Sequence, residues 1–199
     1  MQLGTTLFAT ITNPVTSMRA VRAAPLQMQA PFSPRSMPGV SAPLGFFDPL
    51  GFSTDASESK VLFYREVELK HGRVAMLAAL GFLVGEQFHP LFGGEIDVPS
   101  YIAFQQTPLQ TFWPVVTVPI AILEVFSVFT FNSPFGGELW STRTDYDSGN
   151  LGFDPLGLKP QNPQELFDMK TKEINNGRLA MIGIAGMIGQ ELSTGEKLF

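Results

Sequence analysis

The segment Glu68-Leu-Lys-His-Gly-Arg-Val-Ala-Met-Leu77 recurs 105 residues later as Glu173-Ile-Asn-Asn-Gly-Arg-Leu-Ala-Met-Ile182. Each copy places a carboxylate, a side chain that can bind a metal and an arginine at the start of a long apolar stretch. Such a group of polar side chains does not enter a membrane without partners. Because the segment occurs twice, each copy can supply the partners of the other, and this relation decides the fold.

The four charged side chains of the repeat are predicted to pair between two helices. Within one helix, Glu68 and Arg73 lie five residues apart, about 140° around the axis, so they cannot pair well with each other. We therefore predict that Glu68 pairs with Arg178 and Glu173 with Arg73. Left unpaired, each charge would cost ~3 kcal/mol or more in a bilayer. The alternative is that the four charges reach water separately at the membrane surface.

Three stretches are predicted to form transmembrane helices, at about residues 59–87, 109–131 and 163–190. The uninterrupted apolar part of the first stretch, residues 74–85, has only twelve residues, so hydropathy alone would not identify it. The predicted fold class is therefore an all-α membrane protein, and the distribution of basic residues supports the three crossings.

Basic residues are sorted along the chain as the positive-inside rule predicts. Of the thirteen Lys and Arg, seven precede Val74, five lie within residues 143–178, and one, Lys197, lies near the carboxyl end. Three crossings put the first twelve on one side of the membrane. A soluble three-helix bundle has no reason to sort its bases in this way. Three crossings also make the first and third helices parallel, so we expect them to cross and to be related by a pseudo-twofold axis along the membrane normal.

Composition excludes several classes of protein. The chain has no cysteine, which excludes disulfides, thiolate metal sites and cysteine nucleophiles. A net charge of -5 with scattered basic residues argues against binding to nucleic acid. No nucleophile, base and orienting group occur in a recognisable constellation, so we do not expect an enzyme.

The amino-terminal part differs from the rest of the chain. Residues 1–47 contain no Asp or Glu, three arginines and many Ser, Thr, Ala and Pro, which is typical of an organelle transit peptide. The alternative is an ordinary disordered tail. We assign residues 1–30 to this leader or tail, and residues 31–199 to one three-helix domain.

Several polar residues on the predicted spans are suitable fifth ligands for a magnesium ion held in a flat macrocycle, because magnesium prefers hard oxygen and nitrogen donors. Glu124 is a lone acid in the second span, and it is either a ligand or a protonated group that hydrogen-bonds locally. A single His or Asn on a membrane helix is more often a helix–helix hydrogen bond. Five donors in one small set favour ligation: Glu68, His71, Glu173, Asn176 and Gln190.

Glycines follow the cluster on both outer spans, at Gly81 and Gly85 on the first and at Gly183, Gly186 and Gly189 on the third. They indicate either close helix packing or flat surfaces for ring-shaped ligands. A second repeat, Asp48-Pro-Leu-Gly and Asp154-Pro-Leu-Gly, precedes each outer span and is typical of a turn. The helix and the loop before it were therefore duplicated together.

On these motifs the sequence resembles the light-harvesting chlorophyll-binding superfamily, over about residues 44–195. The short connections and Phe88-His89-Pro-Leu-Phe-Gly-Gly94 resemble the chlorophyll a/c branch, the fucoxanthin or peridinin antenna proteins. The resemblance implies that the five donors ligate chlorophyll magnesium, and that Glu124 and His89 are further ligands. It also implies two carotenoids, with head groups near the Asp48 and Asp154 turns.

The function implied by the resemblance is light harvesting, in which bound pigments pass excitation toward a photosystem. The implied cofactors are chlorophyll a, chlorophyll c and carotenoids of the fucoxanthin or peridinin and diadinoxanthin types. The implied partners are a photosystem core, neighbouring antenna subunits and thylakoid lipids, with the chain as a multi-pass protein of the plastid thylakoid membrane. Two alternatives remain open, a photoprotective family member that dissipates excitation and a pigment-free three-span scaffold.

Overall fold

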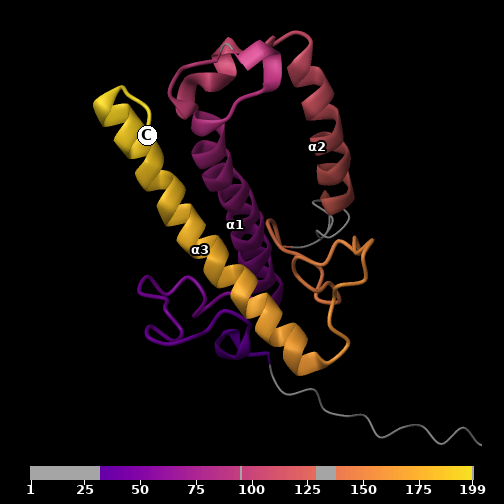
Figure 1. Ribbon diagram of the computed structural model, residues 1–199. Coiled ribbons are helices and arrows are strands. Elements are labelled where there is room, and N and C mark those ends of the chain that lie inside the picture. The colour runs from indigo at the N-terminus through magenta and orange to yellow at the C-terminus, as the bar shows by residue number, and fades with distance from the viewer. Residues whose placement is uncertain (1–31, 95, 129–137, 199) are drawn as a thin grey trace, which may run out of the picture. The chain divides into compact units, whose positions relative to one another are not determined.

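A computed structural model describes residues 32–94, 96–128 and 138–198 (Figure 1). The predicted leader, residues 1–30, lies outside the described residues. These described residues form three long helices, α1 (Glu58–Gln87), α2 (Phe112–Val128) and α3 (Pro163–Thr194). Within the same ranges there are three short 3-10 helices, at Pro34–Ser36, Leu91–Gly94 and Ser100–Gln106. The described residues form no β-strand, and the structure is mostly helical, as the sequence predicts.

The ends of the two outer helices follow from local sequence. Ser57 caps α1 by accepting a hydrogen bond from the Lys60 N–H. Asn162 caps α3 in the same way, and Pro163 occupies the first turn, where its missing N–H costs nothing. Gly195, with φ +71°, ends α3 in the left-handed conformation. Both helices therefore begin within one residue of the predicted starts, 59 and 163.

Helices α1 and α3 cross and run in the same direction (Figure 1). At the crossing, a Cβ built on Gly72 would lie 3.0 Å from the Gly177 Cα, and the reverse contact is the same. The two backbones therefore touch directly at equivalent positions of the repeat. The buried hydrophobic core near this crossing is small, and consists of Val61, Leu69, Ala75 and Ile174 among the described residues.

Helix α2 has 17 residues, and α1 contacts it through Lys70, whose Nζ lies 2.7 Å from Glu124 Oε2. The predicted second span was longer, residues 109–131, and its last three positions lie outside the described residues. In the part of the chain that the structure describes, no helix has both the length and the apolar content to cross a membrane. The prediction of three transmembrane helices stays a prediction.

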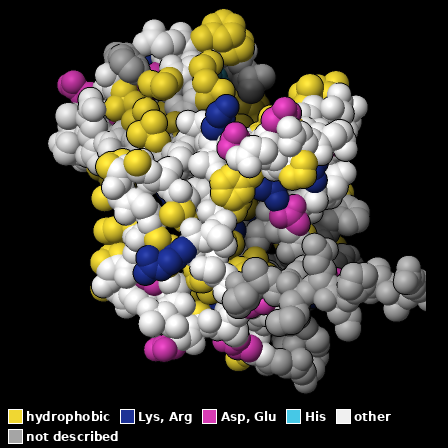
Figure 2. All heavy atoms as spheres, turned by 90° about the horizontal axis from the view of Figure 1, so that it is seen from below, with side chains coloured by type: hydrophobic (Ala, Val, Ile, Leu, Met, Phe, Trp, Pro, Cys, Tyr) yellow, Lys and Arg dark blue, Asp and Glu magenta, His cyan; other side chains and the backbone are white. Residues whose placement is uncertain are grey.

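The end of the bundle at which α1 and α3 begin carries a mixed surface. Figure 2 shows this face, where basic and acidic side chains lie among hydrophobic ones. The paired Glu and Arg residues of the repeat lie between the start and the middle of each outer helix.

Candidate functional site

Two reciprocal ion pairs join α1 and α3 on either side of the glycine crossing. Arg73 Nε lies 2.7 Å from Glu173 Oε1, and Arg178 Nε lies 2.7 Å from Glu68 Oε1. These are the two pairs that the repeat predicts, and the alternative in which four charges reach water separately is not observed. The side chains stay 28% to 41% exposed, so the pairs lie at the edge of the helix contact and not in a sealed core.

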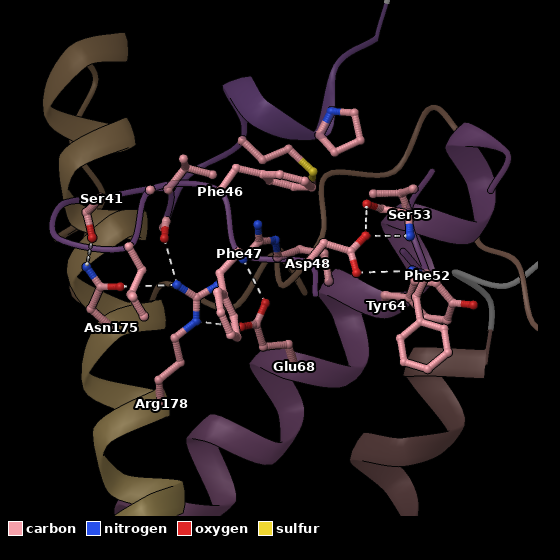
Figure 3. A pocket seen from close by; sticks show the side chains of 18 of the residues that line it. Ser41, Phe46, Phe47, Asp48, Phe52, Ser53, Tyr64, Glu68, Asn175 and Arg178 are labelled. Carbon is pink, nitrogen blue, oxygen red and sulfur yellow. Dashed lines mark hydrogen bonds and ion pairs between the residues drawn. The ribbon is translucent and has the colours of Figure 1, made fainter. Parts of the chain in front are cut away.

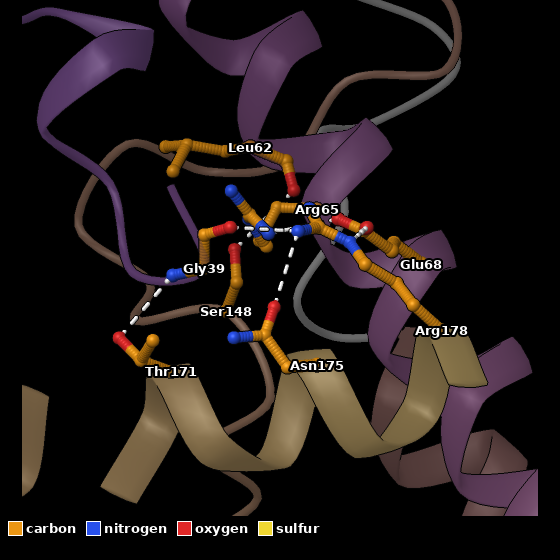
Figure 4. Close-up of polar contacts among 8 residues, drawn as sticks. All are labelled: Gly39, Leu62, Arg65, Glu68, Ser148, Thr171, Asn175 and Arg178. Carbon is orange, nitrogen blue, oxygen red and sulfur yellow. Dashed lines mark hydrogen bonds and ion pairs between the residues drawn. The ribbon is translucent and has the colours of Figure 1, made fainter. Parts of the chain in front are cut away.

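Each arginine also donates a hydrogen bond to a loop, and in each case the loop precedes the other outer helix. Arg73 Nη2 donates to the Gly149 carbonyl at 2.9 Å, in the loop that leads into α3. Arg178 Nη1 donates to the Gly39 carbonyl at 2.6 Å, in the segment that leads into α1 (Figure 4). The loop of each repeat is thus hydrogen-bonded to the helix of the other repeat. Sequence reasoning missed both glycines, because they are 110 residues apart and so break the 105-residue register.

Glycine is required at both loop positions. Gly39 and Gly149 have φ of +89° and +81°, and a Cβ on either would contact the buried residue that follows the glutamate on the opposite helix. On Gly149 the Cβ would lie 2.8 Å from Leu69 Cδ1, and on Gly39 it would lie 2.9 Å from Ile174 Cγ2. The loops therefore sit directly against the crossed helices at equivalent positions.

Replacement of Gly149 by alanine is expected to destabilise the fold more than replacement of Gly152. Both glycines have positive φ, which costs ~1–2 kcal/mol for alanine, but a Cβ on Gly152 meets no atom of the described residues within 4 Å. The contact with Leu69 should add about 1–3 kcal/mol to the G149A variant. Thermal unfolding of both variants, followed by circular dichroism, measures the difference. Equal midpoints would show that the loop does not pack as described.

The two glutamates differ in how their second oxygen is used. Arg65 Nη1 donates to Glu68 Oε2 at 2.8 Å, so both oxygens of Glu68 contact a guanidinium (Figure 4). The repeat places Lys170 where Arg65 stands, and Lys170 pairs with Asp147 instead. Among the described residues, Oε2 of Glu173 has no hydrogen-bond partner. The Glu173 carboxylate is therefore neutralised and still has one oxygen available for a metal.

His71 presents a nitrogen lone pair to the outside of the bundle. Its Nδ1 lies 2.8 Å from the Val67 carbonyl, and because a carbonyl only accepts, Nδ1 must carry the proton. In the neutral imidazole Nε2 then has the free lone pair, and this is the form in which histidine binds metals; the His71 side chain is exposed. Asn176, at the equivalent position of α3, is also exposed and makes no side-chain hydrogen bond within the described chain. Its neighbour Asn175 points elsewhere, toward Ser41 and Arg178 (Figure 3).

The other predicted ligands lie outside this central cluster. Glu124 on α2 pairs with Lys70, and Gln190 is exposed near the end of α3. His89 follows α1, and its Nδ1 is buried without a hydrogen-bond partner in the described residues. No three His, Asp or Glu side chains of the described residues are grouped as a site for a metal ion. Each donor can therefore offer one bond to a metal that another molecule already holds.

The two Asp-Pro-Leu-Gly turns have the same internal hydrogen bonds. Asp48 accepts from the N–H groups of the residues four and five positions ahead, at 3.0 and 2.8 Å, and Asp154 does so at 3.0 and 3.0 Å. The Ser53 side chain and N–H, with weaker help from Phe52, lower the pKa of Asp48. At Asp154 the backbone N–H groups of Lys159 and Leu158 lower the pKa. Both turns are thus held by ionised carboxylates.

A cavity lies beside each of these turns. The first, of about 700 Å³, is lined by Phe46, Phe47, Asp48, Tyr64 and Arg178 among others (Figure 3). The second, of about 610 Å³, is lined by residues of the Asp154 loop and by the Arg73–Glu173 pair. Tyr146 also lines it, and burial, with a smaller effect of the Glu66 carboxylate, raises the pKa of its phenol to about 12. The twofold relation therefore extends from the ion pairs to two cavities of similar size.

The glycines later in the outer helices do not form the helix contact. A Cβ on any of them would meet no atom of the described residues within 4 Å, at Gly81, Gly85, Gly183, Gly186 or Gly189. Of the two sequence interpretations, close packing at these positions is not observed in the described chain. The close contact is made by Gly72 and Gly177, which the sequence analysis did not single out although each lies inside the repeated motif.

Comparison with known proteins identifies the family. The family model described as Chlorophyll A-B binding protein matches residues 33–192. The chain is 48% identical over 185 residues to light-harvesting complex stress-related protein 3.2, chloroplastic, of Chlamydomonas reinhardtii, covering 89% of this chain and 71% of that protein. It is 43% identical over 164 residues to the fucoxanthin-chlorophyll a-c binding protein, chloroplastic, of Isochrysis galbana, covering 80% and 78%. The paired glutamates and arginines, the two cavities and these matches agree, and the chain belongs to the chlorophyll-binding family of the light-harvesting superfamily.

Proposed function

We propose that this protein is a light-harvesting antenna that binds chlorophylls and carotenoids and passes excitation energy to a photosystem. The observation that carries the proposal is the pair of twofold-related sites at the helix crossing. Each has a glutamate neutralised by an arginine of the other helix and an exposed donor one turn further on. His71 in particular holds its imidazole with Nε2 free for a metal. Bound pigments supply the absorption and dipole coupling, and the chain fixes their spacing and orientation.

The proposed chlorophyll ligands differ in whether they have an atom free to bind magnesium. Glu173 has a free carboxylate oxygen, and Asn176 and Gln190 are exposed amides. Glu68 has both oxygens bound, so the Arg65 contact must be released before this carboxylate can ligate magnesium. Glu124 and His89 are two further proposed ligands, each with one polar atom unpaired among the described residues.

The proposed carotenoid head-group sites are the two cavities beside the Asp48 and Asp154 turns. Their linings combine aromatic and apolar side chains with a few polar groups, as a site for a long apolar molecule with polar ends requires. The Tyr146 hydroxyl is buried and has no partner among the described residues, so it can donate to a head-group oxygen. The similarity to fucoxanthin-chlorophyll a-c binding proteins supports chlorophyll a, chlorophyll c and fucoxanthin-type carotenoids as the pigments.

We propose that α1, α2 and α3 cross the thylakoid membrane of a plastid. The exposed apolar side chains support this, because the described residues bury only four hydrophobic side chains and leave a longer set exposed on the second half of α1 and on α2: Val74, Leu77, Leu80, Leu83, Val115, Val118, Ile122 and Leu123. Lipid and pigment would cover this surface. The proposed partners are a photosystem core and neighbouring antenna subunits, and the proposed role involves no catalysis.

Single ligand variants test the proposal. We expect H71A and N176A each to lose one chlorophyll per polypeptide, because both side chains are exposed and their removal leaves the ion pairs intact. The matched control is N175A, which removes the adjacent amide that contacts Ser41 and Arg178, and which should keep the full chlorophyll count. The protein is refolded with a pigment extract, and pigments per polypeptide are counted by chromatography.

Unchanged chlorophyll counts and absorption spectra in both H71A and N176A would support the pigment-free scaffold instead. If N175A loses a chlorophyll and N176A does not, then Asn175 is the ligand and Asn176 is not. Circular dichroism shows whether each variant retains its helix content, so that loss of a ligand is distinguished from loss of the fold.

A photoprotective role is the second candidate, and two observations favour it. A relative at 48% identity is named a light-harvesting complex stress-related protein. In addition, Glu191, near the end of α3, is fully buried, and among the described residues its Oε1 has no hydrogen-bond partner while its Oε2 accepts from the Tyr101 N–H at 2.9 Å. A buried carboxyl group with an oxygen that lacks a donor is a group that can respond to acid. Fluorescence lifetime of the refolded protein at neutral and acidic pH distinguishes the roles, since an antenna keeps its lifetime and a dissipating protein shortens it.

A further inference from the structure

Glu124 is the only charged residue of α2, and α1 supplies its counter-charge. Lys70 Nζ donates to Glu124 Oε2 at 2.7 Å and to the Ser127 hydroxyl at 2.8 Å. The sequence gives no direct sign of this pair, because Lys70 and Glu124 are 54 residues apart and on different elements. Lys70 lies between Glu68 and His71 in sequence, so the first copy of the repeat makes a polar contact with α2, whereas Asn175, at that position in the second copy, contacts Ser41 and Arg178.

The lysine occupies only one side of the carboxylate. Among the described residues, the Lys70 ammonium and the Ser127 hydroxyl both donate to Glu124 Oε2, and Oε1 has no hydrogen-bond partner. The Glu124 side chain is 60% exposed, while that of Lys70 is 28% exposed. The open oxygen therefore lies on the accessible side of a pair whose net charge is zero.

This geometry repeats that of Glu173. There, Arg73 binds Oε1, and Oε2 remains available. A carboxylate that is neutralised through one oxygen can give the other to a magnesium ion without leaving a net charge in an apolar surrounding. Lysine differs from arginine because its ammonium is a compact point charge, which permits contact with two acceptors on α2 at once.

We propose that Lys70 is the positioning residue that makes Glu124 a magnesium ligand for a tetrapyrrole of the chlorophyll class. This inference rests on the proposed function and adds to it the residue on which the α2 site depends. Without the lysine, Glu124 Oε2 would lose the donor that holds it, and the carboxylate would carry an uncompensated charge in an apolar surrounding, so Oε1 would no longer be positioned for magnesium. A neutral amide at residue 124 needs no counter-charge, so it should bind the pigment whether or not Lys70 is present.

The test is a set of four variants refolded with a mixture of chlorophylls and carotenoids. We expect K70M and E124L each to bind one chlorophyll fewer per polypeptide than the unaltered protein. We expect E124Q and the double variant K70M/E124Q to retain the full count, so the second substitution rescues the first. The matched control is K172M, which removes an exposed α3 lysine that makes no side-chain hydrogen bond or ion pair among the described residues, and this variant should keep the full chlorophyll count.

The chlorophyll counts of K70M, E124L and the double variant can each overturn the inference. A full chlorophyll count in K70M or in E124L overturns the inference, as does a double variant that loses as much as K70M, because the pair would then only hold α1 and α2 together. If the unaltered protein binds no chlorophyll, the proposed function fails, and this inference fails with it. Chlorophyll binding by the unaltered protein with an unaffected K70M refutes the inference alone.

Discussion

Replacement of Gly72 by leucine should prevent α1 and α3 from pairing. A Cβ at this position would lie 3.0 Å from Gly177 Cα and 3.5 Å from its carbonyl carbon, both backbone atoms that cannot rotate away. Even alanine should cost about 1–3 kcal/mol, as overpacking does in a filled core. Leucine would force the helices apart and stretch both ion pairs, which flank the crossing.

Because the chain has no cysteine, two introduced cysteines can carry spin labels on α1 and α3 without further changes. The distance between the two labels is expected to be short and narrowly distributed in the unaltered protein, and long or broadly distributed in G72L.

The matched control compares the stability of the G81A variant with that of the G72A variant. Both gain about 1 kcal/mol of helix propensity, but a Cβ on Gly81 meets nothing within 4 Å among the described residues. G81A should therefore be neutral or stabilising, and a G72A variant as stable as G81A would contradict the crossing.

Loss of Arg73 should destabilise the protein much more than loss of Arg178. The R73M variant leaves Glu173 without a counter-charge and leaves the Gly149 carbonyl without its donor. We expect a cost of about 3 kcal/mol, the lower end for a broken buried pair because these side chains are about a third exposed. In R178M, Glu68 keeps Arg65, so the cost should be about 1 kcal/mol, that of ordinary lost hydrogen bonds.

The measurement for these variants is the midpoint of thermal unfolding in detergent. The double variant R65M/R178M should reach the cost of R73M, because Glu68 then has no guanidinium. The control R143M removes an exposed loop pair with Asp145 and should cost about 0–1 kcal/mol. Equal effects of R73M and R178M would show that Arg65 does not compensate and that the two glutamates are equivalent.

The sequence predicted much of the helix architecture because the repeat constrains it. Duplication of the motif related two helices before any contact was known, and the predicted outer spans, 59–87 and 163–190, agree within four residues with α1 and α3. The reciprocal pairs followed from charge alone, since each charge needs a partner that its own helix cannot supply. The repeat did not show where the helices touch. The pattern of small residues drew attention to Gly81 and Gly85, whereas the contact occurs at Gly72, between the charges.

Contacts that depart from the twofold relation could not be predicted from the repeat. Arg65 and Lys70 have long side chains that can reach several elements, and only the folded structure shows that one binds Glu68 and the other Glu124. Gly39 and Gly149 occupy loops of unequal length, so the 105-residue spacing of the repeat does not align them, although both accept from the equivalent arginine. These unmatched contacts decide which proposed ligands are free, and for that reason the ligand set needs direct measurement.

The most direct test of the account is the pigment content of the unaltered protein, purified from its native membrane and analysed by extraction and chromatography. The account predicts several chlorophylls and at least one carotenoid per polypeptide, in a constant ratio across preparations. A folded protein with the circular dichroism of these three helices but without chlorophyll would contradict it.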